Sequence, residues 1–247
     1  MTESGVAIVT GASGTIGLSI VQRLLSDGYR VAALDVEMRE TTQANNLAYV
    51  RADVSNETEV SNAVEQVIRT FNSIDVLVNV AGIVSFGSVC GLAGEEWDRV
   101  MNTNLKSVFL MSRACAPYLC SSERGRLVSI SSVLARNGGN ARPWIDPAEQ
   151  SNSANVAYGA AKAGVNAITA YLAREFAAAG VTVNAVAPGP IETPMTTNFP
   201  DRLKELIPLG RMGKPEDVAA AVAFLVSEEG GFITGEVINL NGGMRSD

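Results

Sequence analysis

The sequence predicts an α/β fold, in which one doubly wound domain holds about seven parallel strands with helices on both faces of the sheet. Two features of the 247-residue chain support this prediction. Short β-branched runs alternate with longer segments whose apolar residues recur at helical spacing. The runs VAIV, VAAL and VLVNV are continuously apolar, as expected of strands buried on both faces. No linker or repeat divides the chain, so residues 1–247 are expected to form a single domain.

The predicted elements alternate along the chain. Strands are expected at Val6–Thr10, Arg30–Leu34, Ala48–Arg51, Val76–Val80, Arg126–Ser131, Val181–Ala187 and Val237–Leu240. Helices are expected at Thr15–Asp27, Glu57–Phe71, Glu95–Tyr118, Val156–Ala179 and Pro215–Ser227. In a sheet of this type, ligands bind at the carboxyl ends of the strands, near the point where the strand order reverses. Candidate site residues are therefore expected in the segments that follow the strands.

Composition excludes several classes of function. The chain has 19 Lys and Arg against 26 Asp and Glu, a net charge of −7, which disfavours nonspecific attraction to nucleic acid or an anionic membrane. It contains no His, which excludes catalytic triads and metal sites that depend on imidazole. Its three cysteines form no CxxC pair, and neither a signal peptide nor an apolar run of ~20 residues is found. We expect a cytoplasmic protein.

A glycine-rich turn, TGASGTIG at positions 10–17, joins the first predicted strand to the first helix. Free N–H groups and a partial positive charge at a helix start suit a pyrophosphate, although an ordinary glycine-rich turn is the alternative. Asp35 follows at about the spacing of the acid that hydrogen-bonds an adenosine ribose, and its charge favours NAD over NADP. Asp53, after the third strand, could contact adenine or cap the next helix.

Tyr158 and Lys162 are four residues apart, so they share one face of a predicted helix. A nearby ammonium lowers the pKa of a phenol, which could then exchange a proton with an alcohol or ketone; the alternative is an ordinary surface pair. Ser131 and Ser132 end the fifth strand and could bind a substrate oxygen. Asn104 is a mediocre helix former within a helical pattern, which hints at a positional role.

In the same order along the chain, eight motifs resemble those of the short-chain dehydrogenase/reductase family. They are TGASGTIG (10–17), Asp35, Asp53, NVAG (79–82), Asn104, ISS (130–132), YGAAK (158–162) and PGPIET (188–193). The resemblance covers essentially the whole chain. It implies a Rossmann-type fold and metal-free hydride transfer between NAD(H) and a secondary alcohol or ketone. It also implies a homotetramer formed through the two long helices and the C-terminal strand, although the small-residue face of the second helix could instead pack on its own sheet.

The resemblance implies a role for each matching residue. Tyr158 is the expected acid/base, Lys162 the residue that holds the nicotinamide ribose and lowers the tyrosine pKa, and Asn104 the holder of a relay water. Ser132, rather than Ser131, is the expected substrate-orienting serine. The expected dinucleotide contacts are Gly11, Ser13, Thr15, Ile16, Gly17, Asp35, Val36, Asp53, Val54, Asn79, Ala81, Gly82, Tyr158, Lys162, Pro188, Gly189, Ile191 and Thr193.

The chain departs from the family pattern at three places: Thr15 stands where a third glycine is usual, Val80 replaces an asparagine, and 26 positions separate Ser132 from Tyr158, about twice the expected separation. The long loop, at about 133–155, and a smaller segment at about 190–212 are expected to border the substrate. Together they predict a pocket for an apolar or aromatic ketone. The substrate contacts expected are Ser132, Trp144, Tyr158 and Met195, and the further pocket residues are Phe86, Trp97, Ile145 and Phe199.

Three alternatives remain open at this point. Trp144 could pack into a subunit interface or into the loop itself. The enzyme could be a 3-oxoacyl-thioester reductase, although such enzymes usually prefer NADPH, and Asp35, Val36 and Glu37 argue against that preference. The chain could also be a dinucleotide sensor without catalysis, which the presence of all four expected catalytic residues disfavours.

Overall fold

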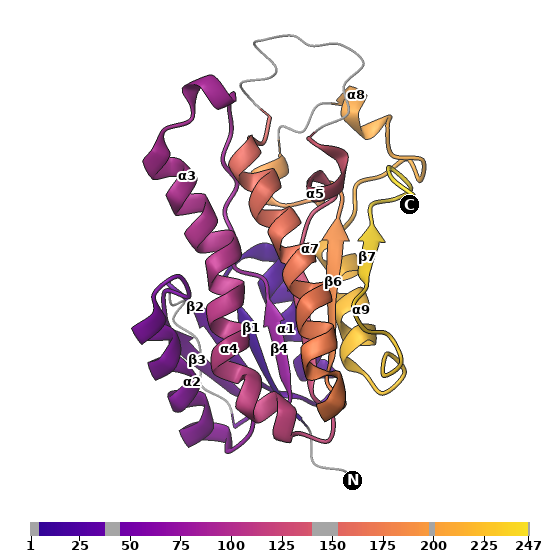
Figure 1. Ribbon diagram of the computed structural model, residues 1–247. Coiled ribbons are helices and arrows are strands. Elements are labelled where there is room, and N and C mark those ends of the chain that lie inside the picture. The colour runs from indigo at the N-terminus through magenta and orange to yellow at the C-terminus, as the bar shows by residue number, and fades with distance from the viewer. Residues whose placement is uncertain (1–4, 38–44, 140–152, 198–200, 247) are drawn as a thin grey trace.

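The computed structural model describes residues 5–37, 45–139, 153–197 and 201–246. Seven strands form one parallel sheet in the order β3-β2-β1-β4-β5-β6-β7, which confirms the predicted fold (Figure 1). The strands are β1 (Val6–Thr10), β2 (Arg30–Asp35), β3 (Leu47–Arg51), β4 (Val76–Asn79), β5 (Arg126–Ile130), β6 (Thr182–Pro188) and β7 (Val237–Leu240). β1 pairs with β2 on one side and with β4 on the other, so the strand order reverses beside β1.

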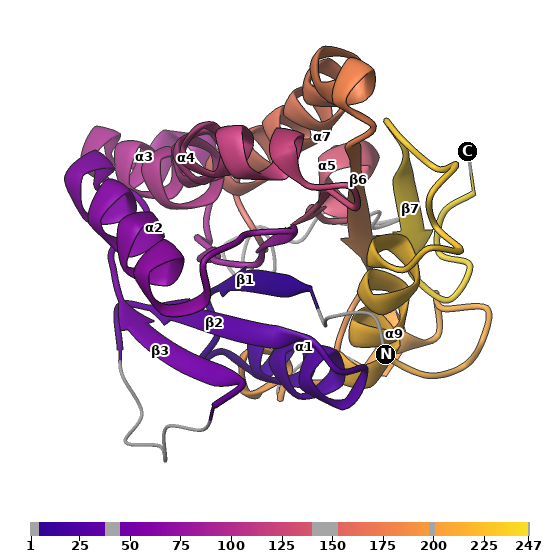
Figure 2. The same cartoon turned by 90° about the horizontal axis from the view of Figure 1, so that it is seen from below.

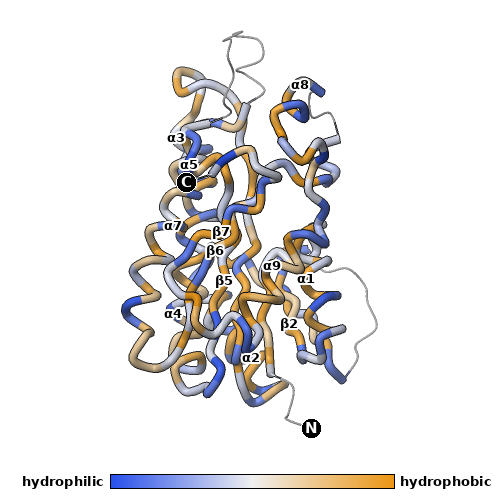
Figure 3. Tube along the Cα trace, turned by 90° about the vertical axis from the view of Figure 1, so that its right-hand side faces the viewer, coloured by the Kyte–Doolittle hydropathy of each residue, from blue (hydrophilic) through white to orange (hydrophobic). Residues whose placement is uncertain are grey.

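Helices cover both faces of the sheet, as Figure 2 shows. One face carries α1 (Thr15–Ser26) and α9 (Pro215–Val226), and the other carries α2 (Glu57–Phe71), α4 (Ser107–Ser121) and α7 (Val156–Phe176). Each layer encloses its own apolar cluster, and the strands form the hydrophobic interior of the chain trace (Figure 3).

Strand β1 explains why the strand sequences are continuously apolar. Val6 and Ile8 belong to the cluster under α2, α4 and α7, whereas Ala7 and Val9 belong to the cluster under α1 and α9. All four side chains are fully buried. Because successive side chains point to opposite faces and both faces are covered, every position of the strand must be apolar.

The long helix predicted over Glu95–Tyr118 is present, but it contains a π-helical turn that the sequence did not predict. The segment forms α3 (Gly94–Met101), a π-helical turn at Asn102–Lys106 and then α4. The physical reason lies at Asn104, whose side-chain Nδ2 donates to the carbonyl of Ile83 (2.8 Å) and whose Oδ1 accepts from its N–H (2.7 Å). A π-helical turn adds one residue to a helix, and such turns are frequent at functional sites.

The other predicted elements agree with the structure to within about two residues at each end. α7 continues into a 3₁₀ turn, Ala177–Ala179, and ends at Gly180 with φ 73°. Short elements that the sequence did not predict are η1 (Val89–Gly91), α5 (Leu134–Asn137), η4 (Pro194–Thr196) and α8 (Asp201–Lys204). Within the described ranges, no helix has both the length and the hydropathy that crossing a membrane requires.

Candidate active site

The turn between β1 and α1 is built around two constrained glycines. Gly11 has φ 61°, and a Cβ there would stand 2.8 Å from the Cα of Ala81. A Cβ on Gly17 would stand 2.1 Å from the carbonyl oxygen of Gly11. The hydroxyl of Thr10 accepts hydrogen bonds from Val80 N–H (3.0 Å) and Ala81 N–H (3.2 Å), which fastens the turn to the end of β4.

Gly14 is less constrained, because its φ is −70° and a Cβ there would lie 3.3 Å from the nearest atom, the oxygen of Gly11. Thr15 in place of a third glycine therefore leaves both constrained positions intact. Gly14 also precedes α1 without a side-chain cap, and the first turn of α1 holds no acidic residue. An uncapped helix start beside a close backbone approach fits the pyrophosphate of a dinucleotide.

Asp35 lies beside this turn at the end of β2. Its carboxylate accepts hydrogen bonds from the N–H of Ser13 (2.9 Å) and the N–H of Glu37 (3.2 Å). Val36 is half exposed next to it, and the guanidinium of Arg51 donates to the Val36 carbonyl (3.2 Å). The predicted ribose-binding carboxylate is thus held rigidly beside the predicted pyrophosphate turn.

Asp53 does not cap the following helix, so that alternative is wrong. Asn56 caps α2 instead, accepting from the N–H groups of Thr58 (3.0 Å) and Glu59 (3.2 Å). One carboxylate oxygen of Asp53 accepts from the N–H (2.9 Å) and the hydroxyl (2.7 Å) of Ser55. Asp53 therefore shapes the turn after β3 through one oxygen.

Tyr158, Ser132 and Lys162 meet where β5 ends against α7. The hydroxyls of Tyr158 and Ser132 are hydrogen-bonded to each other. Lys162 is buried, and its Nζ donates to the carbonyl of Ile130 (2.7 Å), the last residue of β5. Three groups expected from the sequence are thus brought together at the carboxyl edge of the sheet.

Burial governs the proton affinities of this cluster. Burial lowers the pKa of Lys162 to about 8, because the interior disfavours the ammonium. Burial also raises the pKa of Tyr158, and only the hydrogen bond with Ser132 lowers it. Lys162 donates to a carbonyl and is not among the groups that shift the tyrosine pKa, so its expected effect on the phenol stays a prediction.

Ser131 and Ser132 have different partners. The hydroxyl of Ser131 donates to Oδ1 of Asn166 (2.6 Å) and lies 3.2 Å from the carbonyl of Lys162, so it ties β5 to α7. The hydroxyl of Ser132 reaches Tyr158 and accepts from the N–H of Leu134 (3.1 Å). The geometry accordingly places Ser132 beside the phenol.

Gly82 lies close to both Asn104 and Lys162, because a Cβ on Gly82 would stand 3.2 Å from Oδ1 of Asn104 and 3.4 Å from Nζ of Lys162. Asn104 is fully buried, and both of its side-chain polar atoms are used by Ile83. Its side chain is therefore occupied in shaping the π-helical turn, and the expected contact of Asn104 with a water stays a prediction.

The expected nicotinamide loop, residues 188–193, is braced from both sides. Gly189 N–H donates to Leu240 O (2.9 Å), and a Cβ on Gly189 would stand 2.9 Å from the Cα of Asn241. Thr193 N–H donates to the hydroxyl of Thr196 (3.0 Å), which in turn donates to Ile191 O (2.6 Å).

Other expected cofactor contacts have structural partners as well. Asn79 is buried in β4, and its Nδ2 lies 3.4 Å from the hydroxyl of Ser129. Val54 is buried in the apolar cluster under α2, α4 and α7.

The expected substrate pocket is described only in part. Trp144, Ile145 and Phe199 lie outside the described residues, as does the side chain of Met195. Trp97 packs against Val100, Ala157 and Ala161, between α3 and α7. Phe86 is largely exposed and forms a β-bridge with Ala154.

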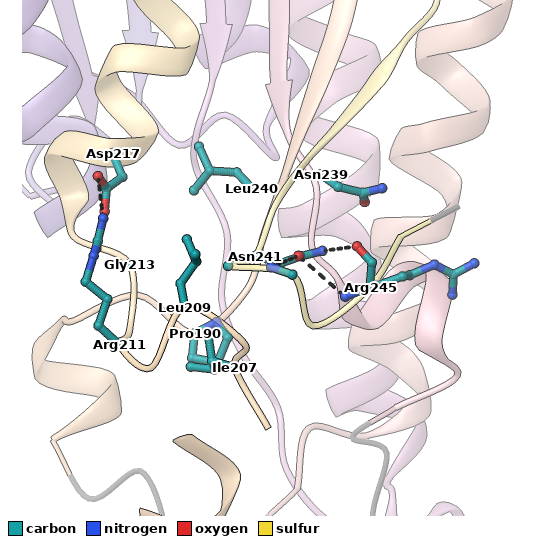
Figure 4. A pocket seen from close by; sticks show the side chains of 12 residues that line it. Pro190, Ile207, Leu209, Arg211, Gly213, Asp217, Asn239, Leu240, Asn241 and Arg245 are labelled. Atoms are coloured by element: carbon teal, nitrogen blue, oxygen red, sulfur yellow. Dashed lines mark hydrogen bonds and ion pairs between the residues drawn. The ribbon is translucent and has the colours of Figure 1, made fainter. Parts of the chain in front are cut away.

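A pocket of about 480 Å³ lies at the carboxyl ends of β6 and β7, bordered by the segment at about 190–212 (Figure 4). Its wall includes the ion pair of Arg211 with Asp217 (2.7 Å) and the side chain of Asn241, whose Nδ2 donates to the carbonyl of Arg245 (3.1 Å). None of the four expected catalytic residues lines it.

Sequence reasoning missed several backbone groups and two side chains of the site. The carbonyls of Ile83 and Ile130 bind Asn104 and Lys162, and no sequence pattern marks a backbone acceptor. Asn155, the N-cap of α7, and Ser85, whose hydroxyl accepts from the Asn155 side chain (2.7 Å), were also missed. The signal for Asn155 was present, because an asparagine directly before a predicted helix is a common N-cap.

Comparisons with known proteins find relatives along nearly the whole chain. A family model described as enoyl-(acyl carrier protein) reductase matches residues 11–245. A 3-oxoacyl-(acyl-carrier-protein) reductase of Staphylococcus aureus is 39% identical over 99% of this chain and 98% of its own. Its counterpart from Thermotoga maritima is 36% identical over 98% of each chain. The ligand-free structure of Thermoplasma acidophilum aldohexose dehydrogenase has a TM-score of 0.84 at 31% identity, covering 99% of this chain and 96% of that one.

Proposed function

Because the chain belongs to the short-chain dehydrogenase/reductase family of oxidoreductases, we propose that it transfers a hydride between NAD(H) and a ketone or secondary alcohol. The observation that supports this most directly is the hydrogen bond between the hydroxyls of Tyr158 and Ser132, with Lys162 buried one helical turn further on. In a chain without His, this cluster is the proton carrier that carbonyl reduction needs.

The bound nicotinamide supplies the hydride, and the residues of the chain supply orientation and the proton. In the direction of reduction, Ser132 and Tyr158 hold the carbonyl oxygen of the substrate, and Tyr158 gives it a proton as the carbon accepts the hydride. The phenolate that remains is stabilised by the positive charge of Lys162. The π-helical turn around Asn104 offers backbone groups, rather than the asparagine side chain, to a water that returns the proton.

We assign NADH as the cofactor on the basis of Asp35. Its carboxylate is held beside the pyrophosphate turn by Ser13, where a 2′-phosphate would meet like charge. The guanidinium of Arg51 donates to the carbonyl of Val36, the residue that follows Asp35. It brings a positive charge toward this site, and the affinities for NADH and NADPH therefore test the assignment.

A 3-oxoacyl thioester is the second candidate substrate, and the names of the relatives at 36% and 39% identity favour it. The first candidate, an apolar or aromatic ketone, rests on Trp144 and Met195, together with the further residues of the long loop. Both substrates present the same ketone to Tyr158, so they differ only in what binds the rest of the molecule.

We propose a homotetramer as the working assembly, with two exposed surfaces that suit a second copy of the chain. Phe109 on α4 and Tyr171 on α7 are 47% and 78% exposed, on the outer side of the long helices. β7 is the last strand of the sheet, and no further strand pairs with it among the described residues. Phe224 on α9 and Phe232, between α9 and β7, are exposed. Burial of such aromatic side chains is typical of subunit interfaces, and light scattering of the purified protein tests the assembly.

The decisive experiment is a titration with NADH and NADPH, followed by initial rates on a panel of ketones and 3-oxoacyl thioesters. We expect tighter binding of NADH, and turnover that Tyr158→Phe abolishes while NADH binding persists. Tyr118→Phe, at the far end of α4, is the matched control and is expected to keep full activity. Turnover that survives Tyr158→Phe would refute the proposal, and binding without turnover of any carbonyl compound would favour a sensor.

A further inference from the structure

Asn155, the last residue before α7, makes contacts in two directions. Its Oδ1 accepts from the N–H of Ala157 (3.1 Å) and from the N–H of Tyr158 (3.3 Å), the residue that carries the catalytic phenol. Its Nδ2 donates to the hydroxyl of Ser85 (2.7 Å) and lies 3.4 Å from the carbonyl of Phe86. One buried amide therefore connects the first turn of α7 to the loop after β4.

The partner of Asn155 is itself anchored. The hydroxyl of Ser85 is hydrogen-bonded to the carboxylate of Glu96 on α3, which also receives two hydrogen bonds from Arg99 (2.6 and 2.8 Å). The hydrogen bonds from Arg99 and Ser85 lower the pKa of Glu96 to about 2, so this carboxylate stays charged at neutral pH. Ser85 is buried at 5% exposure, as is Asn155. Ser85 thus offers Asn155 a fixed acceptor.

Backbone contacts complete the junction at the point where the long loop returns to α7. Gly87 N–H donates to Ser153 O (3.0 Å) and Asn155 N–H donates to Ser85 O (2.9 Å), around the bridge of Phe86 with Ala154. This short antiparallel pairing joins the end of the long loop to the loop after β4.

We propose that Asn155 is a positioning residue for Tyr158, and that its bond to Ser85 sets where the phenol stands relative to Ser132. The inference rests on the proposed carbonyl reduction. A helical side chain leans toward the turn that precedes it, so the phenol projects over the turn that Asn155 begins. Because Asn155 binds the N–H of Tyr158 itself, a shift of the Asn155–Ser85 bond moves the backbone that carries the phenol.

Two variants separate this role from helix capping. Asn155→Ser keeps an N-cap acceptor but loses the donor to Ser85, whereas Ser85→Ala keeps the cap and removes its anchor. For both we expect kcat to fall by about tenfold or more, since displacement of a reacting group by ~1 Å costs about 10²-fold. KM for the ketone and Kd for NADH should stay within about twofold of wild type, because neither residue contacts the expected cofactor site. Wild-type kcat in both variants would overturn the inference and leave capping as the only role.

Asn56 provides a matched control, because it caps α2 through the same pair of contacts, at 3.0 and 3.2 Å. Asn56→Ala should lower Tm by the loss of an N-cap alone, without changing kcat. Hydrogen exchange at the amides of Ala157 and Tyr158 gives a second readout that needs no substrate. Ser85→Ala is expected to speed exchange there, and unchanged exchange contradicts the inference. A wild-type protein that reduces no carbonyl compound would refute the proposed function alone, and the exchange result would still decide the role of Asn155.

Discussion

Removal of the Lys162 charge should stabilise the ligand-free protein while it abolishes catalysis. Burial lowers the pKa of Lys162 from 10.5 to about 8, which corresponds to a penalty of about 3 kcal/mol for keeping the ammonium folded at pH 7. Lys162→Met removes this penalty, but it leaves the carbonyl of Ile130 without its side-chain donor, at a cost of about 1 kcal/mol. The expected net gain is about 2 kcal/mol, or about 4–8 °C in Tm for a chain of this size.

The pH dependence of the same variant gives a second test. A folded-state pKa below the unfolded value means that the penalty is complete below pH 8 and disappears as the pH rises toward 10.5. The stability difference between Lys162→Met and wild type should therefore shrink across that range, as followed by thermal melts without cofactor. Lys106→Met, which removes an exposed ammonium, is the control and should leave Tm unchanged. A variant no more stable than wild type at pH 7, or a difference that is constant with pH, would refute the reasoning.

Three further outcomes are expected at the cofactor and catalytic residues. Gly17→Ala should abolish dinucleotide binding in a fluorescence titration, because its Cβ would stand 2.1 Å from a carbonyl oxygen. Gly14→Ala, whose Cβ would stand 3.3 Å from the nearest atom, should bind dinucleotide within about threefold of wild type. Equal losses of affinity in the two variants would contradict this. Asp35→Asn should improve NADPH affinity by about tenfold, because one charge that repels the 2′-phosphate is removed. An unchanged ratio of NADPH to NADH affinity would count against the role of Asp35 in cofactor preference. Ser132→Ala should raise the pKa of Tyr158, because the hydrogen bond that lowers it is lost. The alkaline rise of alcohol oxidation should then move to higher pH, and a profile that stays in place would exclude Ser132 as that partner.

The sheet and most helices could be predicted from the sequence because burial on both faces leaves a direct pattern. β1 shows this, since the alternate burial of Val6 and Ala7 requires an unbroken apolar run. The glycine turn and the approach of Tyr158 to Ser132 also agree with the motifs. The π-helical turn at Asn104 could not be predicted, because it depends on the backbone of Ile83, which only the tertiary fold brings near.

The protonation of the candidate catalytic cluster was harder to predict than its membership. Spacing places Lys162 on the face of Tyr158, but it says nothing about the carbonyl of Ile130, to which the ammonium donates. The pKa of a buried group depends on all of its surroundings, and a sequence names only a few of them. The anchoring of Asn155 on Ser85, 70 positions away, was hidden for the same reason.

The order of the strands has a consequence for synthesis of the protein. The candidate site is formed by the ends of β1, β4, β5 and β6, which are translated at different times. β1 can pair with its second neighbour, β4, only after β4 has been synthesised. Pairings of such sequence separation form slowly, because a long loop must close before any contact rewards it. The complete dinucleotide site is therefore expected to form only after β6 has joined the sheet.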